Sequence, residues 1–199
     1  MFIYYPVGYH IELRYIIKWI WNITLDKMTM ATTLTTSNLY TAPYDNIFSI
    51  LDTRSNVANP RDASGLKKFV YKDDPEHKAA DFAGFPYIIV YLPMYTNEGA
   101  TASGKSRLFS YRQTVVVRTI KGGSGGSRTD VGHSDMQSIV ESIRKTIDSA
   151  SMKLTLRRAL MFHVNVEVIG YDDTLVYDQR PVYETELEIT YSQRQTISS

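Results

Sequence analysis

The chain has 199 residues, 43% hydrophobic and 22% charged, so it can form one domain plus an extension and is neither disordered nor collagen-like. Its 22 basic and 21 acidic residues give a net charge of +1, which argues against DNA or RNA as a tightly bound partner. It has no cysteine, which excludes disulfides, thiol catalysis and cysteine-based zinc sites.

The first 29 residues differ in composition from the rest of the chain, because they are rich in aromatic residues and hold both tryptophans. Three charged residues interrupt them, so their apolar runs are shorter than the ~20 residues of a membrane span. No signal-peptide cleavage site follows. Two interpretations of this leader stay open: an added packing arm, or an extension upstream of a true start at Met28 or Met30. In both, we expect residues 1–29 to be dispensable for the core fold.

Residues 30–199 are expected to fold as a single domain that begins with a short helix at about 43–52. Pro43 suits the first turn of this helix, and four large apolar residues follow on one stripe. The segment 56–65 has the composition of a loop. Apolar or alternating patterns then predict three strands, over residues 68–72, 85–92 and 108–120, with a flexible polar loop at 94–107.

A second flexible loop is predicted at 121–130, around a run of glycine and serine. The clearest helix follows at about 134–149, where Ser134 and Gln137 have the spacing of a capping box. A second short helix is expected over 152–159. Five apolar residues recur on one face of the longer helix: Met136, Ile139, Val140, Ile143 and Ile147.

Two alternating strands, over 162–168 and 183–191, close the chain. Strict alternation indicates one buried and one wet face, which is typical of an antiparallel sheet. Helices and strands come in separate groups along the chain, so the predicted fold class is α+β. We expect an antiparallel or mixed sheet on which the main helix at about 134–149 and the short helix at about 43–52 pack.

One segment matches a nucleotide-binding motif: residues 99–106, GATASGKS, fit the phosphate-loop pattern G-x-x-x-x-G-K-[ST]. In a true phosphate loop a strand runs directly into the loop and a helix begins at the lysine, because the helix N-terminus is part of the anion site. Here the predicted strand at 85–92 ends well before Gly99, and the residues after Lys105 have the pattern of a strand. We therefore expect a glycine- and serine-rich loop that binds no nucleotide.

The other polar clusters give weaker signals. The acidic segment 73–77, DDPEH, lies beside a proline and is typical of a solvated loop, and Asp172 and Asp173 suit a turn between strands. We expect no catalytic residue, no cofactor and no metal site, and hence not an enzyme. The four histidines lack the spacing of metal ligands: His10, His77, His133 and His163.

The order of elements carries the remaining information. An apolar strand FPYIIVY and a long strand YRQTVVVRTI lead across a loop to an amphipathic helix, and the last strand reads RPVYETELEITY. This series, over about 40–193, resembles the tail-terminator (tail-completion) proteins of long-tailed bacteriophages and related viruses. The resemblance implies a structural virion protein that assembles with itself into a ring, caps the tail tube protein and contacts a neck or head-completion protein.

The resemblance also implies a location and a relation to DNA. DNA would pass through the lumen of the ring without tight binding, which a near-neutral protein permits, and no membrane is involved. The protein would reside in the tail or neck of the virion, and in the host cytoplasm before assembly. Two alternatives stay open: another small virion assembly protein, such as a neck or minor capsid subunit, and a phosphate-loop nucleotide-binding enzyme.

The phosphate-loop match yields a direct prediction. Isothermal titration of the protein with Mg-ATP should give no saturable signal, because the helix that builds the anion site is not predicted. Lys105→Ala should therefore leave the titration unchanged. A micromolar signal that disappears in Lys105→Ala would overturn the structural interpretation.

Overall fold

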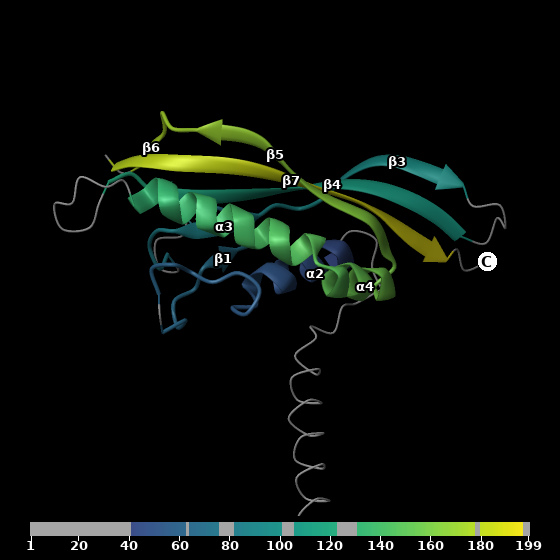
Figure 1. Cartoon of the computed structure of the whole chain (residues 1–199). Coiled ribbons are helices and arrows are strands. Elements are labelled where there is room, and N and C mark those ends of the chain that lie inside the picture. The colour runs from purple at the N-terminus through teal and green to yellow at the C-terminus, as the bar shows by residue number, and fades with distance from the viewer. Residues whose placement is uncertain are drawn as a thin grey trace, which may run out of the picture. The chain divides into compact units, whose positions relative to one another are not determined.

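The computed structural model describes residues 41–62, 64–75, 82–100, 106–122, 131–177 and 180–196 (Figure 1). The leader, residues 1–29, lies outside them, so its expected dispensability stays a prediction. The described part contains both helices and strands, which confirms the mixed α+β class. Its helices are α2 (Thr41–Asp52), α3 (Val131–Asp148) and α4 (Ala150–Arg158). Its strands are β1 (Val70–Tyr71), β2 (Tyr87–Val90), β3 (Met94–Ala100), β4 (Ser106–Ile120), β5 (Met161–Asp172), β6 (Val176–Tyr177) and β7 (Arg180–Thr196).

The strands form one mixed sheet with the order β1-β2-β4-β7-β5. Its centre is the antiparallel pair of β4 and β7, whose register runs from Ser106 opposite Thr196 to Ile120 opposite Val182. β3 pairs with β4 on the same side as β2, and β6 pairs with the start of β7. Only β1 and β2 are parallel among the described pairs.

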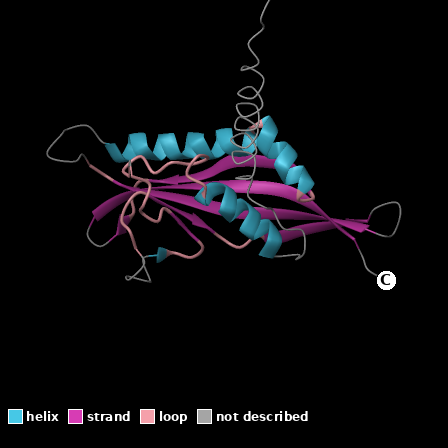
Figure 2. Cartoon of the chain, turned by 90° about the horizontal axis from the view of Figure 1, so that it is seen from below, coloured by secondary structure: helices cyan, strands magenta, loops and turns pink. Residues whose placement is uncertain are grey.

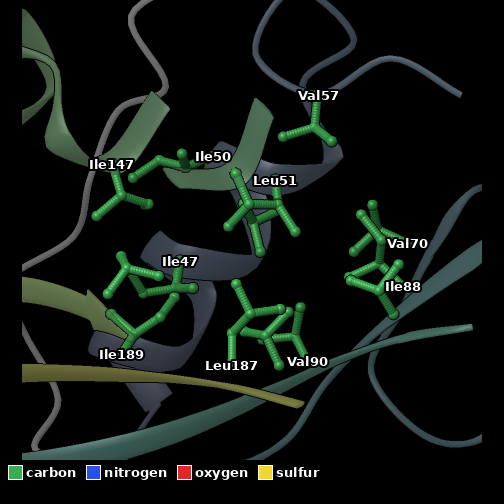
Figure 3. Packing of buried hydrophobic residues seen from close by; sticks show 14 of the residues in the cluster. Ile47, Ile50, Leu51, Val57, Val70, Ile88, Val90, Ile147, Leu187 and Ile189 are labelled. Carbon is green, nitrogen blue, oxygen red and sulfur yellow. The ribbon is translucent and has the colours of Figure 1, made fainter. Parts of the chain in front are cut away.

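Alternation along β7 sets the two faces of the sheet, as the sequence pattern predicts. Thr185, Leu187, Ile189 and Tyr191 are buried, whereas the glutamates between them are half-exposed. The helices lie on the buried face (Figures 1 and 2). Figure 3 shows apolar side chains of α2 pointing toward those of β2 and β7. Each large apolar side chain buried there stabilises the fold by roughly 1.5–3 kcal/mol.

The main helix begins three residues before its predicted start at Ser134, because α3 opens at Val131. Ser134 is exposed inside the helix, so the capping-box prediction is wrong. A true cap precedes α4, where the hydroxyl of Ser149 accepts a hydrogen bond of 3.2 Å from the backbone N–H of Met152. The predicted apolar face of α3 is buried at Met136, Ile139, Ile143 and Ile147 and half-buried at Val140.

The flexible loop predicted at 94–107 is mostly strand. Residues 94–100 are β3, and residues 106 and 107 belong to β4. Strand propensity is low in this polar segment, but hydrogen bonding to β4 overrides it, because sheet formation depends more on the neighbouring strand than on the residue. Residues 101–105, and 123–130 of the second predicted loop, lie outside the described residues.

Strict alternation in the strand predicted at 162–168 is also wrong. The register of β5 against β7 shifts between Phe162 and Asn165, where His163 has a φ of 52°, and again between Val168 and Gly170. Such bulges turn side chains from one face to the other. Val168 comes before the second bulge and pairs with Leu187, so it stays on the helix-covered face, where it is nevertheless 46% exposed.

The face of the sheet without helices is not wet throughout, contrary to the prediction. Tyr87, Ile89 and Val116 are buried on this side, where the rings of Phe82 and Phe85 pack against them. Phe82 meets Tyr87 edge-on at a centroid distance of 5.2 Å. A small second core therefore lies across the sheet from the helices. None of the described helices is long and apolar enough to cross a membrane.

The position of α3 gives a stability prediction. Ile143→Asp should lower the free energy of unfolding by more than about 4 kcal/mol, because Ile143 is fully buried and the new carboxylate would have no partner. Glu141→Gln, on the exposed face of the same helix, should change stability little. Urea unfolding followed by circular dichroism measures both. Equal losses in the two variants would mean that the helix face is misassigned.

Candidate assembly surfaces

The described ends of the phosphate-loop match belong to two paired strands, β3 and β4. Gly99 pairs with Leu108 and Ala100 with Arg107, so β3 and β4 are antiparallel neighbours across the motif. The prediction that a strand follows Lys105 is confirmed, since β4 begins at the next residue. The expectation that no strand runs into the motif is wrong, because β3 does. A strand and not a helix therefore follows Lys105 directly, whereas the motif uses a helix N-terminus to bind a phosphate.

In its described part, the acidic segment 73–77 forms an ion pair with the sheet. The carboxylate of Asp74 is 2.7 Å from the Arg118 guanidinium. Glu76 and His77 of this segment lie outside the described residues. Across the ranges that are described, no three histidine, aspartate or glutamate side chains are grouped so that they could hold a metal ion.

Asp172 has the turn role that its sequence context predicts. Its carboxylate accepts hydrogen bonds of 2.7 Å from both the backbone N–H and the hydroxyl of Thr174. These bonds lower the pKa of Asp172. His163 is exposed on β5, and His133 lies on α3 with its ring edge-on to Tyr183 at 5.8 Å.

Arg118 organises the polar part of the helix-free face. Its guanidinium is 2.5 Å from Glu184 on β7, 2.7 Å from Asp74 in the loop after β1, and 3.1 Å from the Tyr87 hydroxyl. Only 17% of its side chain is exposed. This network fastens the loop after β1 to the central strands, so its role is structural.

Exposed apolar side chains gather at two places on the molecule. The first, here named the β3 patch, spans the end of β2 and the start of β3. The second, named the β5 patch, lies on β5 and β6. The β3 patch consists of Tyr91, Leu92, Met94 and Tyr95, whose side chains are 37%, 64%, 66% and 44% exposed. The β5 patch consists of Val168, Ile169, Tyr171 and Val176, exposed by 46%, 51%, 52% and 67%.

The strands of the two patches lie on opposite sides of the central β4–β7 pair. β5 is the outermost strand on one side, whereas β3 lies beyond β4 on the other side. They are also offset along the strands, since Met94 is level with Arg112 of β4 and Val168 with Leu187 of β7. Open strand edges with apolar side chains are typical sites of association with another chain. The molecule therefore presents two different surfaces to neighbours.

Carboxylates lie on the opposite face of the sheet from Val168 and Tyr171. Glu167 and Asp172 of β5 stand opposite Glu188 and Glu184 of β7, and the Glu186 side chain of β7 lies against the backbone of Gly170. Within the described ranges Glu167, Asp172 and Glu186 form no ion pair. Glu167 accepts a hydrogen bond of 2.7 Å from the Asn165 amide. Val168 and Tyr171 pair with Leu187 and Thr185, so they share the helix-covered face and these carboxylates do not surround them.

The outer surface of α4 carries basic residues. Leu154 is 52% exposed, and Arg157 and Arg158 follow it at helical spacing. Neither arginine pairs with a carboxylate in the described part of the chain. Lys153 pairs with Asp148 at 3.0 Å and lines, with Arg157 and His163, a hollow of about 190 Å³. We name Lys153, Leu154, Arg157 and Arg158 the α4 surface.

Sequence reasoning missed these surfaces. The alternating pattern of 162–168 predicts a buried Val168, and the composition of 94–107 predicts a loop at residues 94 and 95. Basic residues on both sides of Leu154 are a sequence signal of an exposed surface, but nothing in the alternating pattern indicates that Val168 is exposed. Comparison with known protein families finds no family that matches the sequence, and comparison with curated proteins finds no similar relative.

The Arg118 network gives a second stability prediction. Arg118→Met should cost about 3 kcal/mol, because it leaves the half-buried carboxylates of Glu184 and Asp74 without their cation. Arg112→Met is the matched control, since Arg112 is 58% exposed and 3.7 Å from Glu188. Chemical unfolding should show a clear loss for the first variant and little change for the second. A similar, small effect of both would contradict the structural role of Arg118.

Proposed function

We propose that this protein is a structural subunit that assembles with copies of itself into a ring, of the tail-terminator type found in long-tailed bacteriophages and related viruses. The observation that carries the proposal is the pair of apolar patches on opposite, open edges of one sheet. Closed rings require contacts between two different surfaces of each subunit, so that every copy has a neighbour on either side.

A two-fold dimer accounts for the two patches less well than a ring does. A two-fold dimer uses one self-complementary surface, which would leave the second patch in water. An apolar patch of this kind is costly unless a partner covers it. Two distinct patches are accounted for when each copy contacts at least two other molecules.

The fold supports the assignment of the proposed ring to the tail-terminator type. The resemblance implies a sheet with a long amphipathic helix and a short N-terminal helix on it, and α3 and α2 share one core with the sheet. β3, β4 and β7 extend past α4 at one end of the sheet (Figure 1). Such a projection suits contact along the axis with the tail tube protein, or with a neck or head-completion protein.

The charge distribution is compatible with DNA in the lumen. Tight binding to the DNA backbone requires a basic excess, and the chain has a net charge of only +1. DNA would therefore pass through the ring without being held. In this proposal the protein resides in the tail or neck of the virion and, before assembly, in the host cytoplasm.

Size-exclusion chromatography with light scattering tests assembly of the full chain. We expect ring-sized particles whose share rises with protein concentration. Ile169→Asp should raise the concentration needed for assembly about tenfold or more, because it places a charge in the β5 patch. Leu66→Asp is the control, since Leu66 is 88% exposed and belongs to neither patch. A protein that stays monomeric at all concentrations would refute the proposal.

Electron microscopy then distinguishes a tail terminator from a neck or minor capsid subunit. Purified rings mixed with tail tubes of the same virus should bind at one end of each tube. Binding to empty capsids, with none to tubes, would assign the protein to the neck or capsid.

A further inference from the structure

We infer that the hollow between α4 and β5 binds a small tetrahedral oxyanion, such as a free phosphate or sulfate ion. The hollow has a volume of about 190 Å³, and we name it the α4–β5 hollow. Its lining residues all belong to one copy of the chain, so the inference goes beyond the proposed ring and does not depend on it. They are Lys153, Arg157, Met161, His163 and Val164.

Three of the lining side chains can donate hydrogen bonds to an anion. Lys153 and Arg157 stand four residues apart on α4, so they are neighbours on its surface. Like charges at this spacing destabilise a helix, and an anion bound between them would remove that cost. A histidine ring carries an N–H donor in either protonation state, so His163 adds a third donor. The hollow thus combines two positive charges with donors from two different elements.

A β-bulge places His163 beside the two basic residues of α4. The register of β5 shifts between Phe162 and Asn165, so that His163 and Val164 together stand opposite the single residue Tyr191 of β7. Tyr191 belongs to the core on the helix-covered face, which is the face that carries α4. The bulge therefore adds a residue to β5 on the side of the sheet where the hollow lies.

The backbone around this bulge is strained and firmly held. Leu160 has a φ of 62° and His163 a φ of 52°, in the left-handed region that residues with a Cβ atom rarely adopt. The Leu160 carbonyl accepts a hydrogen bond of 3.1 Å from the backbone N–H of Arg194 on β7, and Met161 is fully buried. These contacts fix the position from which His163 reaches the hollow. Backbone strain of this kind is common at binding sites.

The cationic side chains of the hollow are only partly neutralised within the copy. Arg157 and His163 form no ion pair with a carboxylate in the part of the chain that the structure describes. Lys153 is 3.0 Å from Asp148, but 41% and 42% of these two side chains are exposed, so water screens the pair. One carboxylate leaves a positive charge at the hollow. An oxyanion would supply the missing negative charge through charge-assisted hydrogen bonds.

The size of the hollow restricts the ligand. Pockets for drug-sized molecules have volumes of ~300–1,000 Å³. The α4–β5 hollow, at about 190 Å³, suits a single small ion and not a nucleotide. This agrees with the expectation that Mg-ATP does not bind.

Basic residues at the end of a helix also have a purely structural role, since they offset the negative end of the helix dipole. This role applies equally to Arg157 and Arg158, because both lie in the last turn of α4. It does not account for Lys153 or His163 at the same hollow. Arg157 lines the hollow and Arg158 does not, so the two arginines distinguish the two roles.

Thermal melting of the full chain in sodium sulfate tests the site, with sodium chloride added to keep the ionic strength constant. We expect the Tm to rise with sulfate and then level off, with half of the rise at about 1–10 mM, as suits a small ion with few contacts. Arg157→Gln should raise this half-saturating concentration about tenfold or more, because it removes a charge-assisted hydrogen bond. Arg158→Gln is the matched control and should leave it unchanged.

His163→Gly tests the contribution of β5. Glycine adopts a φ of 52° without strain, so this variant should melt normally in sodium chloride alone. Its half-saturating sulfate concentration should rise about fivefold or more, because one donor to the anion is lost. Sodium phosphate should act on all variants as sulfate does. A short DNA duplex with the same concentration of phosphate groups should not raise the Tm, because its linked phosphates cannot enter the hollow.

Three results would overturn the inference. A Tm that rises linearly with sulfate in every variant would show only the general stabilisation that sulfate gives to folded proteins. Equal effects of Arg157→Gln and Arg158→Gln would assign both arginines to the end of the helix. A rise in Tm with the DNA duplex that disappears in Arg157→Gln would make nucleic acid the ligand in place of a free ion.

Discussion

The antiparallel ladder between β4 and β7 is the constraint on which the rest of this structure depends. It pairs Ser106–Ile120 with residues 182–196 without a register shift. A one-residue slip would turn Leu187 and Ile189 out of the core and the glutamates of β7 into it. The register therefore decides which face the helices cover, and it brings Arg118 opposite Glu184.

The length of this ladder also explains why apolar residues remain exposed. The helices share their core with one face of the sheet, but β3 and β5 lie at its open edges. Covering both edges within a single chain would require further elements. Neighbouring copies can cover them instead, at the cost of assembly entropy, which repeated contacts in a closed ring offset. The proposed assembly thus follows from a sheet whose edge strands are not covered by other elements of the same chain.

The phosphate-loop match illustrates how chemistry depends on the elements around a motif. GATASGKS has the required residues, yet β3 and β4 meet as a hairpin beside it. The residues after Lys105 indicated a strand, and this indication was correct. The polar residues before Gly99 gave no indication of β3. They form a strand because they pair with β4, which lies later in the chain. Local sequence contains no information about that partner.

The sequence by itself determined the α+β class, the apolar face of α3 and the inward residues of β7, because periodicity records which side chains avoid water. Only the tertiary structure decided the bulges of β5, the extent of β3 and the position of α4 relative to the far end of β5. Each depends on hydrogen bonds between segments far apart in the chain. Val168 shares the helix-covered face with Leu187 and is still 46% exposed, which its neighbours in sequence do not indicate, so the candidate surfaces became visible only in three dimensions.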